Sequence, residues 1–133
     1  MKKDIEIPKV TDVAVAAVRE QTEEGENWVV YLLNLKDTPI TGVLVSSKGY
    51  GQINDESVKT SVLRHFLDTV PAQSAARIEP IMDNVFSLSN EYWVSFYVKE
   101  LIHDKKFIFL PGSISDAFFT HIPLLDTRGV LIV

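Results

Sequence analysis

Hydrophobic residues recur along this chain in short runs that are separated by turn-forming residues. In residues 27–46 (NWVVYLLNLKDTPITGVLVS), two apolar runs rich in β-branched and aromatic residues flank the turn-forming segment 36–39. This pattern predicts a strand, a tight turn and a second strand. Residues 28–35 are apolar on both alternating positions apart from Asn34. Such a run is typical of a central strand covered on both faces, or of one whose second face packs on a partner.

Further strands are predicted on the same grounds. Residues 13–20 form one candidate, and the acidic segment 20–27 that follows is interpreted as a solvated hairpin tip. The clearest hairpin alternates over 92–98, turns around His103 and returns over 106–110. Shorter candidates complete the set at 72–81, 122–125 and 129–133.

Seven or eight short strands with frequent turn signals predict an all-β fold, specifically an immunoglobulin-like antiparallel β-sandwich. We expect a single domain over residues 1–133, because the chain has no internal repeat, low-complexity tract or linker. A helical turn is expected near 115–119, and another fits within 82–89. The disulfide that marks antibody domains is absent, so the topology is predicted from strand number and alternation alone.

Residues 56–70 fit two different structures. Val58, Val62 and Phe66 fall with other apolar residues on one face of a helix, and Pro71 would end that helix. The β-branched residues of the same segment also alternate as they would in a strand. Periodicity leans slightly towards one helix at 56–70, but both structures stay open.

The composition, with 46% hydrophobic and 23% charged residues, is that of an ordinary globular protein. The absence of cysteine excludes disulfides, thiolate zinc sites and cysteine nucleophiles. The basic start lacks the apolar core of a signal peptide, and no run approaches the ~20 apolar residues of a membrane span. We therefore expect a cytoplasmic protein with no membrane partner. A net charge of −5 with scattered basic residues argues against nucleic acid as the main partner.

We find no motif for catalysis, for a cofactor or for a metal. The three histidines, His65, His103 and His121, lack the spacing of a metal site. No serine lies in a G-x-S-x-G or S-x-x-K motif. The glycine-containing segment 46–51 lacks the spacing of a Walker phosphate loop and is interpreted as a loop between strands. We expect no cofactor and a protein that is not an enzyme.

The apolar excess on both strand positions, without a chemical motif, favours a non-catalytic interaction or structural domain. The expected partner is a protein, with a homodimer through sheet edges or an exposed aromatic face as the leading form, and Trp93 and Tyr97 as interface candidates. A weaker hypothesis is RNA contact through the aromatic hairpin. The main alternative is a small-molecule-binding protein, or an enzyme without a recognised motif, whose loop-lined pocket is formed by Tyr50, Arg64, His65 and Glu79.

Six segments, PITGVLVSSKGYG, KTSVLRHF, IEPI, NEYWVSFY, KFIF and RGVL, resemble a family of short, functionally uncharacterised bacterial proteins. The resemblance covers nearly the whole chain and implies no activity, cofactor or site residue. Members of that family look β-rich at the positions matching 59–66, which favours a strand there. Some similar chains carry the label of a phenylalanyl-tRNA synthetase alpha subunit. This chain is far too short for such a catalytic domain and lacks the arginine motifs that position ATP.

Overall fold

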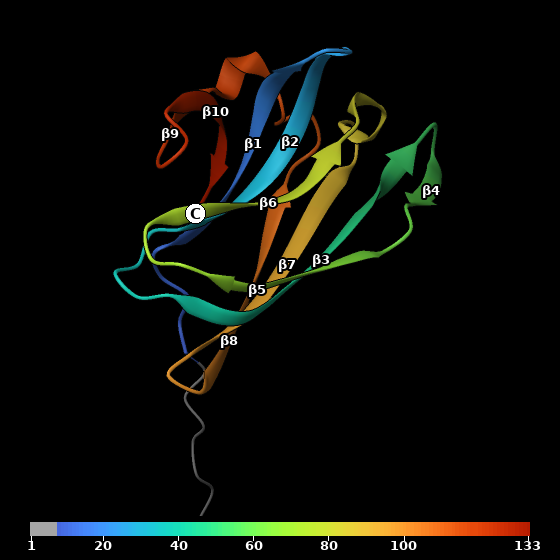
Figure 1. Cartoon of the computed structure of the whole chain (residues 1–133). Helices are drawn as coiled ribbons and strands as arrows, with labels where there is room; N and C mark the ends of the chain where they lie inside the picture. Colours follow the sequence, from blue (N-terminus) through green and yellow to red (C-terminus); the bar gives the residue numbers. More distant parts are fainter. Residues whose placement is uncertain (1–7) are drawn as a thin grey trace, which may run out of the picture.

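A computed structural model describes residues 8–133, which form two antiparallel five-stranded sheets packed as a sandwich (Figure 1). The all-β prediction is therefore confirmed, and the described chain contains no α-helix. It has ten strands instead of the expected seven or eight. They are β1 Val13–Thr22, β2 Gly25–Asn34, β3 Ile40–Ile53, β4 Glu56–Lys59, β5 Leu63–Val70, β6 Ser74–Ile81, β7 Ser89–Val98, β8 Leu101–Phe109, β9 Thr120–Ile122 and β10 Thr127–Ile132.

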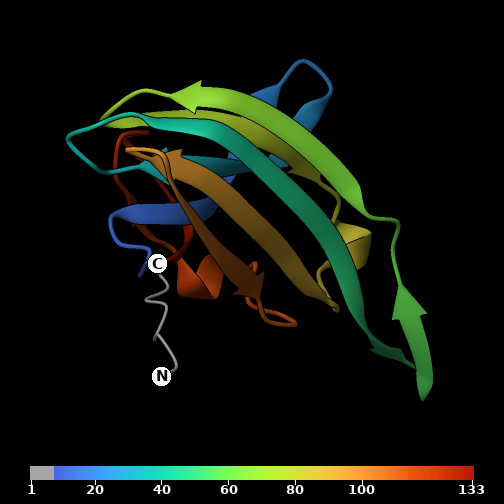
Figure 2. The same cartoon turned by 90° about the horizontal axis from the view of Figure 1, so that it is seen from below.

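The two sheets have different strand orders. Sheet A has the order β6-β2-β1-β10-β9, and sheet B has the order β4-β3-β7-β8, with β5 also paired to β3. β4 and β5 occupy successive parts of one edge of β3, because β4 pairs with residues 50–53 and β5 with residues 40–47. Figure 2 shows the curved β3 and β5 side by side, with β4 at the far end of β3. β5 and β6 thus lie at edges of different sheets and contact each other.

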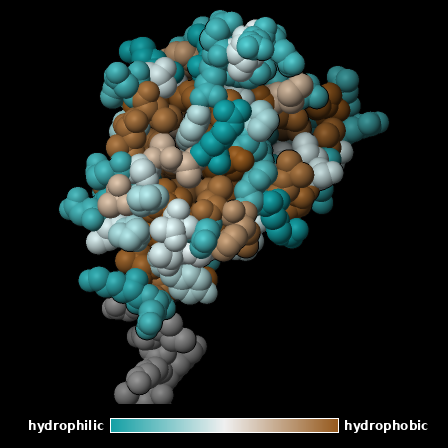
Figure 3. All heavy atoms as spheres, viewed as in Figure 1, coloured by the Kyte–Doolittle hydropathy of each residue, from teal (hydrophilic) through white to brown (hydrophobic). Residues whose placement is uncertain are grey.

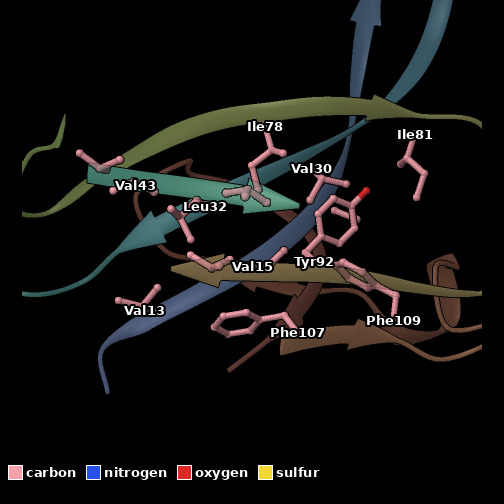
Figure 4. Close-up of a cluster of buried hydrophobic side chains, with 14 of the residues drawn as sticks. Val13, Val15, Val30, Leu32, Val43, Ile78, Ile81, Tyr92, Phe107 and Phe109 are labelled. Atoms are coloured by element: carbon pink, nitrogen blue, oxygen red, sulfur yellow. The ribbon is translucent and has the colours of Figure 1, made fainter. Parts of the chain in front are cut away.

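The main core lies between the two sheets. The side chains that point inward alternate along each strand, as the two-residue period of a strand requires. Val15 and Leu32 of sheet A face Val45 and Phe96 of sheet B, and all four are fully buried. The largest buried side chains are aromatic and come from the β7–β8 hairpin (Figure 4).

A second apolar cluster covers the other face of sheet A. Ala14 and Ala16 of β1 alternate with the core residues of that strand, and both are fully buried with Leu33 of β2 and Ile122 of β9. β2 lies between β1 and β6, so it is a central strand with both faces covered. This is one of the two arrangements that its doubly apolar sequence predicted.

The prediction of a helix at residues 56–70 is wrong. These residues form β4 and β5, separated by a short break. Both strands pair with β3, so β-branched and aromatic residues gain cross-strand partners that outweigh the helical periodicity of the isolated segment. The helical turns are present as the 3₁₀ turns η1, Asp83–Val85, and η2, Asp116–Phe118.

Two loop predictions are also corrected. Residues 46–51 are not a loop but part of the long strand β3, which pairs on both edges. The β7–β8 turn lies at Lys99 and Glu100 and not around His103. Both turn residues have positive φ (49° and 65°), as in the type I′ turns that match the twist of a hairpin. The usual Asn-Gly signal for such a turn is missing, so the sequence did not locate it.

Candidate functional site

A largely buried carboxylate lies where the edges of the two sheets meet. Glu79 of β6 has a side chain only 12% exposed. Its Oε1 accepts hydrogen bonds from Ser47 Oγ and His65 Nε2, each at 2.7 Å, and its Oε2 accepts one from the Tyr92 hydroxyl at 3.0 Å. A carboxylate can only accept, so His65 carries a hydrogen on Nε2. Glu79 belongs to sheet A and its three donors belong to sheet B, so these bonds join the sheets.

Strand register brings the three donors together. Ser47 is directly opposite Tyr92 on β7, and both point inward. His65 pairs with the buried Val45 on the same inward face of sheet B. Residues opposite each other in an antiparallel pair share a face, so the donors form one group.

A β-bulge aims Glu79 at this group. On β6, Glu79 is opposite Val30 while Arg77 is opposite Tyr31, so Ile78 is an extra residue in the strand. Strict alternation would send Ile78 and Glu79 to opposite faces. The bulge allows both to face inward, which is how bulges commonly redirect a functional side chain.

A cavity of about 220 Å³ lies beside the carboxylate. Its walls come from β3, the β4–β5 connection, the end of β6, η1 and β7. Glu79, Tyr92 and Asn90 contribute polar groups, and Leu63 and Ile81 contribute apolar surface; further polar and apolar residues complete the lining. Figure 4 shows Tyr92 among the core side chains near Val30 and Ile81.

Tyr92 serves as a permanent donor in this group. Its burial, together with the charge of Glu79 and the hydrogen bond to it, raises the pKa of Tyr92 far above the ordinary tyrosine value of 10.0. The phenol therefore stays protonated over the physiological range.

Of the four residues predicted to share a pocket, the structure brings only two together. His65 and Glu79 are hydrogen-bonded. Tyr50 lies on the opposite, outer face of sheet B, where its hydroxyl donates to Glu91 Oε1 at 3.3 Å. Arg64 pairs with Ser46, also on the outer face. Because neighbouring residues of a strand point to opposite faces, Arg64 and His65 diverge.

Sequence reasoning missed Ser47 and Tyr92 as members of the site. A signal for Ser47 existed, because it is a polar residue on the same alternating positions as the apolar Val43 and Val45. Tyr92 had no such signal, since a tyrosine in an aromatic strand is ordinarily a core residue. Among residues 8–133 no group of three or more metal-ligating side chains exists, and no helix is long and apolar enough to cross a membrane.

The outer face of sheet B carries exposed apolar side chains. Trp93 and Tyr97 of β7, the predicted interface candidates, are 45% and 43% exposed there. The Lys106 ammonium lies 4.7 Å from the centre of the Trp93 ring. Elsewhere too, hydrophobic side chains reach the surface among hydrophilic ones (Figure 3). We define the aromatic face by the exposed residues Leu44, Phe66, Trp93, Tyr97 and Ile102.

Comparisons with protein-family models, curated proteins and solved structures found no match for this chain. The resemblance to uncharacterised bacterial proteins therefore stays a prediction. Two features of the structure bear on function: the cavity beside Glu79 and the aromatic face.

Proposed function

We propose that this protein is a non-catalytic interaction module that forms a homodimer through the aromatic face. The observation that carries the proposal is that five exposed apolar side chains share one face of sheet B. Phe66 is directly opposite Leu44, and Tyr97 is directly opposite Ile102, with Trp93 on the same face of the central strand β7. Groups of exposed apolar side chains often mark interaction surfaces, and tryptophan and tyrosine are among the residues that most often anchor them.

The charges around the aromatic face suit a second copy of the chain. Lys106 is opposite Trp93, and Asp104 is opposite Ser95, so both signs occur on neighbouring rows of one face. A two-fold interface places the same patch on both partners. A patch that carries both signs can then pair acidic groups of one copy with basic groups of the other.

The arrangement around Glu79 supports a non-catalytic role. Ser47 Oγ and His65 Nε2 both donate to the same carboxylate oxygen. A serine nucleophile needs its hydroxyl directed at the base that removes its proton. Here the imidazole and the hydroxyl both donate to the Glu79 carboxylate, so the imidazole does not accept the proton of the Ser47 hydroxyl.

An immunoglobulin-like topology is also part of the proposal. In such folds one sheet has the strand order A-B-E-D and the other has the order C-F-G, with the strands lettered along the chain. The second strand therefore lies beside the fifth, and the third strand pairs with the hairpin of the last two strands. The neighbours β2 and β6, and the order β3-β7-β8, support this relation. The β9–β10 hairpin, which adds to the edge of β1, would be an extension of that plan.

Sedimentation equilibrium over a range of dilutions tests the dimer. We expect a concentration-dependent dimer for the unmodified chain and a monomer for the double variant Trp93→Glu, Tyr97→Glu. The control Leu124→Glu introduces the same charge at an exposed leucine in the β9–β10 turn of sheet A and should leave dimerisation unchanged. A chain that stays monomeric from micromolar to millimolar concentration would overturn the proposal.

A further inference from the structure

We propose that the cavity beside Glu79 binds a small organic ammonium ion. The first reason is that the carboxylate lacks a Lys or Arg partner. Among the ion pairs of residues 8–133, Glu79 is joined only to His65, whose imidazole carries a charge only when it is protonated. Its other two partners are neutral hydroxyls. A buried charge is normally balanced by an opposite charge, so beside a neutral His65 this cavity has a place for a cation.

The neighbouring basic side chains are engaged elsewhere. Lys48 borders the cavity, but its ammonium lies on the outer face of sheet B, 3.8 Å from Glu91. Arg77 pairs with Glu20 at 3.0 Å. Neither supplies the missing charge to Glu79.

The cavity wall adds a further acceptor and an apolar surface. The Asn90 side-chain nitrogen donates to Val85 O at 2.9 Å and to Leu88 O at 3.2 Å, which leaves its Oδ1 as an acceptor. Glu79 has about four acceptor positions, and its three hydrogen bonds leave one of them open. Leu63 and Met82 contribute apolar surface. An ammonium head with a short alkyl group matches this combination of a carboxylate, an amide oxygen and hydrocarbon walls.

Other ligand classes fit less well. An anion would be repelled by Glu79. A divalent metal ion is usually held by several charged or imidazole ligands, whereas the described chain has no group of three or more His, Cys, Asp or Glu that could hold one. The volume of about 220 Å³ lies below the range of drug-sized pockets, so the ligand is small.

The test is an NMR titration of the isotope-labelled full chain with three ligands of similar size: n-butylammonium, n-butanol and butyrate. Ionic strength is kept constant. We expect saturable shifts for n-butylammonium at the backbone amides of residues 47–49, 60–61 and 90–92, an affinity about tenfold or more lower for n-butanol, and no saturation with butyrate. The alcohol can make the same hydrogen bond without the charge, so it isolates the role of the carboxylate.

The variant Glu79→Gln should abolish the preference for the cation and bind n-butylammonium and n-butanol equally. Glu56→Gln, at an exposed carboxylate on β4, is the matched control and should behave as the unmodified chain. Equal binding of alcohol and ammonium by the unmodified chain, or no saturable shift in the cavity, would overturn the proposal. That comparison needs no variant, so it decides the matter even if Glu79→Gln fails to fold.

Ammonium binding is independent of the proposed dimer. The monomeric variant Trp93→Glu, Tyr97→Glu should bind n-butylammonium with unchanged affinity, because both substitutions lie on the opposite face of sheet B from Glu79.

Discussion

The second faces of the two sheets both carry apolar side chains but have different surroundings. On sheet A, Ala14, Ala16 and Leu33 are fully buried in a cluster that also contains residues of the β9–β10 hairpin. On sheet B, Leu44 and Trp93 remain 37% and 45% exposed. Both faces carry apolar side chains, but on sheet B polar residues such as Ser46 and Ser95 lie between them. Apolar residues on both alternating positions of a strand therefore indicate a second apolar face. They do not indicate whether other residues of the chain cover that face.

The largest expected effect comes from truncating the covered face. Leu33→Ala should lower the free energy of unfolding by about 2–5 kcal/mol, because it leaves a cavity in the second cluster of sheet A. The matched variant Leu44→Ala, on the aromatic face, should cost under about 1 kcal/mol in the monomer. Urea denaturation at dilute, monomeric concentration measures both. Equal losses would show that the two faces do not differ in packing as described.

The close approach of β1 and β10 gives a second test of the covered sheet. A Cβ at Gly129 would lie 2.5 Å from the backbone oxygen of Ala17, so Gly129→Ala forces the two strands apart. We expect a loss of about 1–3 kcal/mol in thermal or urea unfolding. Thr120→Ala, at the exposed residue paired with Gly129, should change stability by less than about 0.5 kcal/mol. If Gly129→Ala leaves the free energy of unfolding unchanged, the close approach of β1 and β10 is contradicted.

Tyr92, on the inward face of sheet B, should lower the free energy of unfolding at alkaline pH. The pKa of Tyr92 is raised in the folded chain, whereas in the unfolded chain it stays near 10.0. Above pH ~10 the unfolded chain loses this proton and the folded chain keeps it, so unfolding becomes more favourable by up to about 1.4 kcal/mol per pH unit. Urea unfolding at pH 9 and pH 11 measures the decrease.

Tyr92→Phe is the control for this pH effect. It removes the ionisable group, so it should lessen the fall in stability between the two pH values, although losing the bond to Glu79 lowers stability at both. An unchanged pH dependence would show that Tyr92 is not the group responsible.

The smallest effect is expected on the aromatic face. Lys106→Ala removes the ammonium that lies 4.7 Å from the Trp93 ring, and it should cost at most about 0.5–1 kcal/mol in the monomer. A double-mutant cycle with Trp93→Ala isolates the interaction. A coupling energy above that range would mean that the face is more tightly organised than its exposure indicates.

The sequence predicted part of the candidate site. His65 and Glu79, two of the four residues predicted to form a pocket, are hydrogen-bonded. The sequence did not group Ser47 and Tyr92 with Glu79, because these residues lie on three strands whose register depends on pairing far along the chain. The bulge at Ile78 is equally invisible in the sequence, since nothing local distinguishes it from regular alternation.

By itself, the sequence determined the all-β class, most of the strands and the presence of apolar residues on two faces of several strands. These features follow from local periodicity, which a strand displays whatever it packs against. Only the tertiary structure decided that 56–70 is extended, which apolar face is covered and which side chains meet Glu79. Those outcomes depend on pairing between segments that are distant in the sequence, such as β3 with β5 and β7. The free energy of this pairing depends on both partner strands, so neither segment alone predicts it.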